Sequence, residues 1–271
     1  MLFPYAIVLV VFAAPIVHGA PTASSVSQPP PAVSQPPSVP VITNGSAIAA
    51  ELLVEASSVD RFTKLLTDSN GVLLTGEALR ELTVFDFNQQ LNATVNSTGI
   101  DGDAGVGGSI LISSVDNFPI LTELGISGAA SFIAPCGLNI PHLHPRSDEF
   151  FTLVEGVLDT GFVLENGFTQ LVTTQLGKFQ ATVFPKGSLH FQQNPTCDPA
   201  VFVAGFDSSD PGRSDLANNL WQFPGDVVNA ALGFPDTIDG TNIEAWRAHL
   251  PFNLAAGVDS CLQACGLTSE E

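Results

Sequence analysis

Four side chains of metal-ligating type lie in two short stretches of this chain. His142 and His144 are two residues apart, and Glu149 follows His144 by five residues. His190 lies in the second stretch and follows the Pro-x-Gly turn at 185–187 by three residues. Three imidazoles and one carboxylate make a mixed nitrogen and oxygen ligand set, which suits Mn, Fe or a related divalent metal. These residue types predict one metal site made of His142, His144, Glu149 and His190.

Strands would have to position these ligands. Residues i and i+2 of a β-strand point to the same face, so a strand through His142 and His144 directs both rings to one side. The alternative is that these two are ordinary histidines on a solvated face. Four histidines remain once His18, in the expected signal peptide, is set aside. Three of these four lie in the two ligand stretches, and this clustering favours the metal site. His249, alone near Arg247, is interpreted as an ordinary histidine.

The region around these ligands is typical of an all-β domain. Short β-type runs alternate with Gly, Asn and Asp, as expected for an antiparallel sandwich or small barrel. The predicted strands are residues 109–113, 130–134, 150–154, 158–164, 182–184 and 200–204.

The flanking segments differ in composition. Residues 47–66 carry apolar residues near helical spacing, and helical patterns return at 215–221, 225–232 and 241–250. The expected organisation is a signal peptide (1–20), a Pro/Ser-rich linker (21–44), an N-terminal arm (45–84), a β-barrel with the metal site (85–207), and a helical C-terminal extension with a Cys pair (208–271).

Charge excludes two classes of partner. The chain has 271 residues, with 8 Lys and Arg against 27 Asp and Glu, for a formal net charge of −19. Such an excess of acid argues against binding nucleic acid or an anionic membrane surface. The expected partner is a small-molecule substrate. Arg146 and Lys186, beside the ligand motifs, could form a local positive patch for an anionic one.

Several features indicate a secreted glycoprotein. An apolar run at 6–14 is followed by Pro15 and small residues, the pattern of a signal peptide, although no basic residue precedes the run. A membrane anchor is the alternative, but the run is short for a span. Asn44, Asn92 and Asn96 begin N-glycosylation sequons.

The four cysteines form an even set. Cys136, Cys197, Cys261 and Cys265 predict two disulfides in a secreted chain, and the sequence alone leaves three connectivities open. Metal ligation by cysteine is the competing interpretation, but no paired C-x-x-C spacing supports it.

The two histidine motifs together resemble those of the cupin superfamily. His142-x-His144-x4-Glu149-x6-Gly156 matches its first motif, and Pro185-x-Gly187-x2-His190-x3-Asn194 matches its second. The resemblance is closest to germins and germin-like proteins, including fungal and slime-mould spherulin-type members, over residues 85–250. It implies a single jelly-roll β-barrel, a secreted homo-oligomer, and Mn bound by His142, His144, Glu149 and His190.

The resemblance also implies substrate contacts. Two asparagines contact the substrate in oxalate-oxidising germins; one corresponds to Asn139, and Ala129 replaces the other. Gln192 and Asn194 are further candidates, although Asn194 could serve only a turn.

In a barrel, Cys136 and Cys197 would lie near the same end. This suggests a Cys136–Cys197 bridge, with Cys261 and Cys265 paired in the tail.

The function expected from sequence is therefore Mn-dependent redox chemistry on a small oxygen species or a small acid. Superoxide dismutation makes the fewest demands on the site, because it needs only a redox-active metal and access to it. Oxalate oxidation is the weaker expectation, because Ala129 replaces the second substrate-contacting asparagine. A different Mn or Fe cupin dioxygenase is another option. The alternative from another class is a non-enzymatic wall or spore-coat glycoprotein in which the metal is structural.

Overall fold

The computed structural model describes residues 36–40, 42–88, 103–105, 107–233 and 254–267. By its internal contacts the chain divides into residues 1–37 and 38–271, and all helices and strands of the described residues belong to the second unit. The expected signal peptide, most of the linker, Asn92, Asn96 and the expected helix at 241–250 lie outside the described residues. No helix in the described ranges has the length and apolar character needed to cross a membrane.

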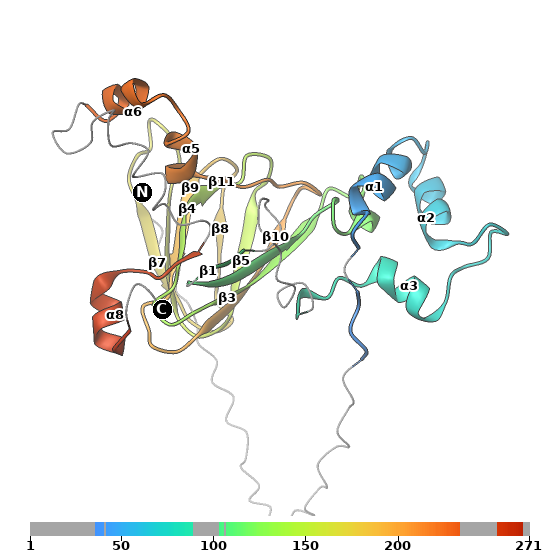
Figure 1. Cartoon of the computed structure of the whole chain (residues 1–271), viewed down its shortest axis with the longest axis horizontal. Helices are drawn as coiled ribbons and strands as arrows, with labels where there is room; N and C mark the ends of the chain where they lie inside the picture. The colour runs from blue at the N-terminus through green and yellow to red at the C-terminus, as the bar shows by residue number, and fades with distance from the viewer. Residues whose placement is uncertain (1–35, 41, 89–102, 106, 234–253, 268–271) are drawn as a thin grey trace, which may run out of the picture. The chain divides into compact units, whose positions relative to one another are not determined.

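Two antiparallel sheets form the body of the molecule (Figure 1). The first has the strand order β1-β2-β3-β10-β5-β8, and the second β11-β4-β9-β6-β7, with β12 also paired to β4. The strands are β1 Asp103–Gly105, β2 Gly108–Ser113, β3 Ser127–Ile133, β4 Leu138–Leu143, β5 Glu149–Glu155, β6 Leu158–Val163, β7 Val172–Leu176, β8 Ala181–Phe184, β9 Leu189–Gln193, β10 Ala200–Phe206, β11 Ser214–Asp215 and β12 Leu254–Ala255. This arrangement confirms the predicted all-β jelly-roll class, and each of the six predicted runs lies on a strand. The mostly exposed β7 was not predicted, because its sequence VTTQL lacks an alternating apolar face.

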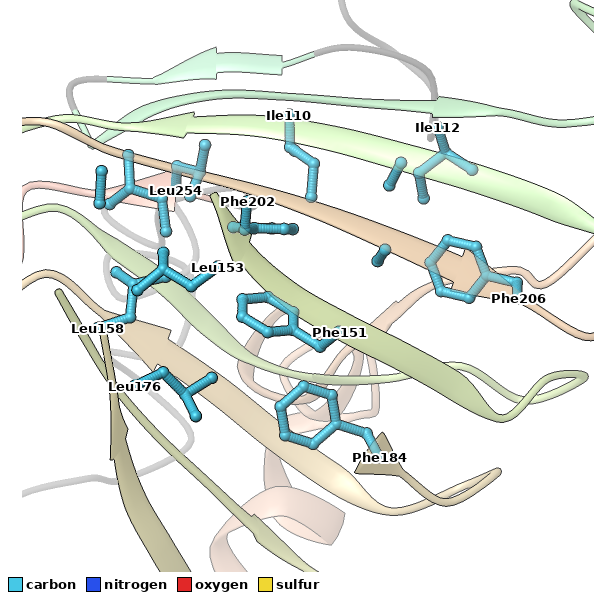
Figure 2. Close-up of a cluster of buried hydrophobic side chains, with 14 residues drawn as sticks. Ile110, Ile112, Phe151, Leu153, Leu158, Leu176, Phe184, Phe202, Phe206 and Leu254 are labelled. Carbon is cyan, nitrogen blue, oxygen red and sulfur yellow. The ribbon is translucent and has the colours of Figure 1, made fainter. Parts of the chain in front are cut away.

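The core lies between the two sheets (Figure 2). Phe151 of β5 and Phe202 of β10 are at its centre, with ring centroids 4.4 Å apart. Leu158 of β6 and Leu176 of β7 reach the same cluster from the opposite sheet. Alternate residues of β5 and β10 are buried, as period-2 patterning requires, and burial of this apolar surface drives the packing of the sheets.

Among the described residues, the helices α1 Gly45–Leu53, α2 Ser58–Leu66 and α3 Gly76–Thr83 precede the sheets. The helix-like stretch expected over 47–66 is divided into two helices, α1 and α2. Ser57 is in an extended conformation, and its side chain accepts a hydrogen bond from the Asp60 N–H, which caps a new helix. The 3-10 turn η1 (Pro119–Leu121) contacts α1, and Ser46 Oγ of α1 donates to Asp116 Oδ1 at 3.1 Å.

The segment after β10 is not wholly helical, contrary to the prediction. It contains α5 Leu216–Leu220, α6 Gly225–Ala231 and α8 Asp259–Cys265, but also β11 and β12. Both of these short strands pair with β4, the strand that carries His142. Leu254 of β12 is fully buried in the core, so this part of the chain completes the barrel.

The disulfides correct the suggested pairing. Cys136 is bonded to Cys261 and Cys197 to Cys265, so all four cysteines are oxidised but neither suggested bridge forms. Cys136 and Cys197 do lie in neighbouring loops, since the Cys136 N–H donates to Thr196 O. The returning chain brings α8 against both loops. The two tail cysteines, one helical turn apart, each bond to a different loop.

Gly257 is required by the close approach of the tail to the barrel. Its φ is +90°, and a Cβ there would lie 1.6 Å from the carbonyl oxygen of Cys136. We expect Gly257→Ala to lower the free energy of unfolding by more than about 2 kcal/mol, measured by denaturant titration. Gly71→Ala is the control, because Gly71 has a φ of +75° with nothing within 4 Å of the added Cβ. Equal losses in the two variants would contradict the clash.

Candidate metal centre

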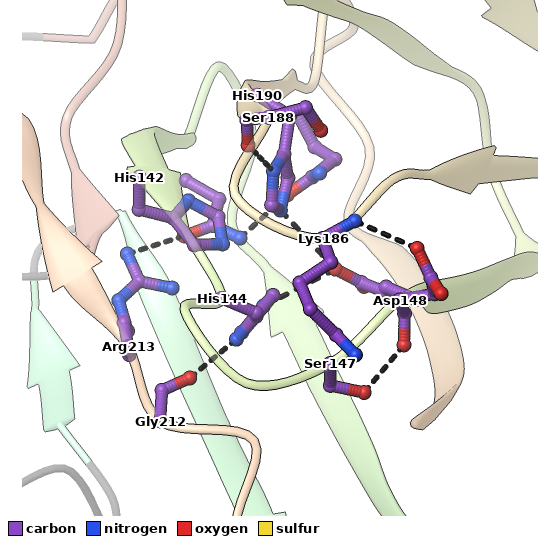
Figure 3. Close-up of polar contacts among 12 residues, drawn as sticks. His142, His144, Ser147, Asp148, Lys186, Ser188, His190, Gly212 and Arg213 are labelled. Carbon is purple, nitrogen blue, oxygen red and sulfur yellow. Dashed lines mark hydrogen bonds and ion pairs between the residues drawn. The ribbon is translucent and has the colours of Figure 1, made fainter. Parts of the chain in front are cut away.

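The four predicted ligands converge inside the barrel (Figure 3). His142 is on β4 with His144 directly after it, Glu149 begins β5, and His190 is on β9 opposite His142. One ligand atom from each residue lies within 4.8 Å of every other. All four side chains are buried. The spacing argument for His142 and His144 is confirmed, since both rings face the interior.

Backbone carbonyls determine the tautomer of each ring. Nδ1 of His142 lies 2.7 Å from Ile140 O, Nδ1 of His190 lies 2.9 Å from Ser188 O, and Nδ1 of His144 contacts the carbonyl of Gly212. A carbonyl oxygen only accepts, so Nδ1 carries the proton and a neutral ring keeps its Nε2 lone pair. Ligating histidines are held in the same way in metal sites generally.

The inward-facing atoms therefore form a set of acceptors. Glu149 Oε2 lies 3.2 Å from Nε2 of His144 and 3.1 Å from Nε2 of His190. Within the described part of the chain, neither Glu149 Oε2 nor His190 Nε2 has a hydrogen-bond partner of good geometry. Buried acceptors that face one another need protons or a cation between them. The residues present therefore fit a divalent metal ion.

Charge and burial act on two of these groups in opposite ways. Burial, then the positive charge of Arg213 and the neighbouring histidines, holds the pKa of His142 well below its usual 6.5, so this ring stays neutral. Burial alone would raise the pKa of Glu149. The neighbouring His144 and His190 outweigh burial and lower that pKa to about 2.

Two aromatic rings pack against histidines of the cluster. The Phe184 ring stacks on His190 with centroids 4.3 Å apart and an angle of 8° between the planes. Phe206 meets His144 at 4.7 Å with an angle of 60°. A surface pocket of about 590 Å³ lies beside the site and shares Glu149, Phe184 and Phe206 with it.

Known proteins resemble this chain in sequence and in fold. The Cupin family profile matches residues 103–238. Spherulin-1A of Physarum polycephalum is 34% identical over 222 residues, covering 82% of this chain and 80% of its own. Germin-like protein 8-2 of Oryza sativa subsp. japonica is 44% identical over 117 residues, covering 43% and 53%. A recombinant oxalate oxidase in complex with glycolate superposes with a TM-score of 0.50 at 26% identity, covering 55% and 76%.

The chain belongs to the cupin family. In this germin-like cupin, a β-bulge adapts strand β4 to the site. Asn139 pairs with Gln192 and His142 with His190, so β4 has one more residue than β9 between these pairs. Without the bulge, residues 139 and 142 would face opposite sides. With it both are buried, and Pro141, which has no N–H to donate, lies at the bulge, where the strand pairing is irregular.

The candidate substrate residues differ in their surroundings. Both polar atoms of the Asn139 side chain are engaged: Nδ2 donates to Gln192 Oε1 at 2.5 Å, and Oδ1 accepts from Arg213 Nη2 at 3.0 Å. Asn194 holds a turn, since its side chain bonds Ala134 O, Asp198 O and the Thr196 backbone N–H and hydroxyl. Ala129, at the position of the second family asparagine, is buried on β3.

Sequence reasoning missed the contribution of residues 212–215. The Gly212 carbonyl orients His144, and Arg213 bonds Asn139 and, through Nε, Asp215 Oδ1 at 2.8 Å. In the sequence, this segment shows only an Arg and an Asp two residues apart after a Pro-Gly pair, and such a pattern does not indicate that the Arg side chain is buried.

The positive patch suggested for Arg146 and Lys186 is offset by acidic residues. Arg146 pairs with Asp210 at 2.6 Å, and Lys186 lies near Asp207.

The low pKa values of His142 and Glu149 predict acid lability of the metal-free protein. The unfolded chain binds protons at these residues below pH 6.5 and 4.5, respectively, where the folded state does not. The free energy of unfolding therefore falls with pH through both windows, by a few kcal/mol for Glu149 between pH 4.5 and 2. Denaturant titrations of chelator-treated protein at several pH values would measure this loss. Glu149→Gln should flatten the lower window, and an unchanged slope there would contradict the assignment.

Proposed function

We propose that this protein is a secreted manganese-binding germin-like cupin that carries out redox chemistry on a small oxygen species or a small acid. The observation that carries the proposal is the convergence of three Nε2 atoms and one carboxylate oxygen, with ring orientation fixed by backbone carbonyls. Such a set favours Mn or Fe over metals that prefer thiolates.

Four residues would bind the metal, and two phenylalanines pack beside them. His142, His144, Glu149 and His190 would hold the ion, and the four ligands would leave open positions on a six-coordinate metal. When bound, the metal would supply one-electron redox chemistry and a Lewis-acid site for a small oxygen-containing substrate. Phe184 and Phe206 exclude water beside two of the ligands, which strengthens electrostatic interactions there.

Two observations bear on the substrate. Superposition on an oxalate oxidase in complex with glycolate supports a small carboxylate. Ala129 removes one polar contact expected of oxalate-oxidising germins, which favours superoxide dismutation instead. Because the net charge of −19 repels both anions at long range, we expect either activity to rise as salt is added up to moderate ionic strength.

The expected setting is extracellular, in the medium or the cell wall. Two disulfides suit an oxidising compartment, and germin-like relatives in Arabidopsis thaliana and Oryza sativa share the fold family. Asn44 is exposed at the start of α1 and available for glycosylation; Asn92 and Asn96 are proposed as further sites. We further propose that the protein is a homo-oligomer that acts on a small molecule and has no nucleic acid or membrane partner.

A structural role for the metal is the second candidate. The ligands come from β4 and β9 of one sheet and from β5 of the other, so a bound ion would cross-link the two sheets. This position would suit a stable wall or coat glycoprotein as well as an enzyme.

Metal content decides between these proposals. Mature protein purified from a secreting host without chelators should contain about one Mn per chain by elemental analysis. The same sample is then assayed for superoxide dismutation and for oxalate-dependent peroxide formation. One Mn with neither activity would favour the structural role, and a metal-free, folded protein would overturn the manganese proposal.

A further inference from the structure

A chain of side-chain hydrogen bonds with a defined direction runs beside the metal centre. Arg213 Nη2 donates to Asn139 Oδ1, and Asn139 Nδ2 donates to Gln192 Oε1. Arginine has no acceptor, so it can meet only the oxygen of the Asn139 amide. The amide nitrogen of Asn139 must then face Gln192, and this in turn selects the oxygen of Gln192.

The end of this chain is an N–H donor inside the barrel. Gln192 is 1% exposed, and its Nε2 has no hydrogen-bond partner among the described residues. Gln192 lies two residues after His190 on β9, so both side chains are on the inner face of the strand. A buried amide donor of this kind favours a ligand with an acceptor oxygen.

Arg213 itself is built into the site. Its side chain is 4% exposed, and Asp215 balances its charge through Nε, away from the atom that meets Asn139. Ser214 and Asp215 pair with Leu143 and His142, which brings the turn alongside the ligand strand. In Figure 3 the guanidinium is directed toward His142.

We propose that Arg213 is a positioning residue that locks the amides of Asn139 and Gln192, so that the metal pocket presents an N–H donor to a small carboxylate substrate. An apolar residue at 213 would let both amides turn over. Gln192 could then present either its N–H group or its oxygen to the pocket, and the pocket would lose its preference for an anion. This inference rests on the proposed metal site.

Glycolate and its neutral amide, glycolamide, are suitable probes for calorimetric titration of the Mn-loaded protein. Arg213→Met should weaken glycolate binding roughly 10- to 100-fold and leave glycolamide binding nearly unchanged. Arg213→Lys should restore most of the preference, because an ammonium group also only donates. Arg61→Gln is the charge-matched control: Arg61 lies on α2, where it bonds Glu55 O and Ser58 Oγ.

Asn139→Asp supplies an independent test in case Arg213→Met fails to fold. Aspartate accepts only, so Gln192 would have to turn its Nε2 toward residue 139 and its oxygen toward the pocket. Glycolate binding should fall at least as far as in Arg213→Met. Unchanged glycolate binding in either folded variant, with one Mn per chain, would overturn the role of Arg213 and leave the proposed function standing. A wild-type protein that binds no Mn would overturn both.

Discussion

Replacing His142 or His190 with alanine is expected to abolish stoichiometric metal binding. Both rings are buried and lie opposite each other on β4 and β9, with Nδ1 held by a backbone carbonyl. Altering the groups that orient a metal ligand already costs roughly 10- to 100-fold in affinity, so loss of a ligand should cost more than about 100-fold. Elemental analysis of dialysed protein, together with the metal dependence of the melting temperature, measures the effect.

The controls separate loss of the ion from loss of the fold. His249→Ala removes a histidine that sequence analysis places outside the site and should retain one metal per chain. The metal should also raise the stability of wild-type protein, because an ion that binds only the folded state stabilises it by mass action. That increment should be absent in His142→Ala and His190→Ala. Full metal content in either variant would exclude these four residues as the binding site.

Removal of the Cys136–Cys261 disulfide should produce the largest loss of stability. Its cysteines are 125 residues apart in sequence, and the bond joins the loop before β4 to α8. Closing so long a loop restricts the unfolded chain, and loss of a native bridge typically costs about 2–5 kcal/mol. The double variant Cys136→Ala/Cys261→Ala, compared with wild type by denaturant titration, tests this expectation.

Both cysteines of a bridge must be replaced together. Cys136 Sγ lies 3.5 Å from Cys265 Sγ of the other bridge, so a single free thiol could exchange with it. Cys197→Ala/Cys265→Ala is the matched control; its separation of 68 residues predicts a somewhat smaller loss. Peptide mapping without reduction should join Cys136 to Cys261. A Cys136–Cys197 peptide would contradict the observed pairing and restore the one suggested by sequence.

Residue spacing along the chain predicted part of the metal centre but not all of it. The i, i+2 relation of His142 and His144 fixed their common face, since alternation along a strand is a property of the backbone itself. Apolar runs punctuated by Gly and Asn likewise identified β2, β3, β5, β6, β8 and β10. Asn139 is different, because it shares the inner face with His142 only through a bulge, which counting residues cannot reveal.

By itself, the sequence determined the family, the strand-forming segments and the four candidate ligands, because each depends on residue types at short, regular spacing. Only the tertiary structure decided which cysteines pair, and that Gly212 and Arg213 reach the metal centre. These contacts join residues up to 125 positions apart. They form because the chain after β10 returns to pair with both ends of β4, and such long-range pairing follows from packing of the whole barrel, not from local preference.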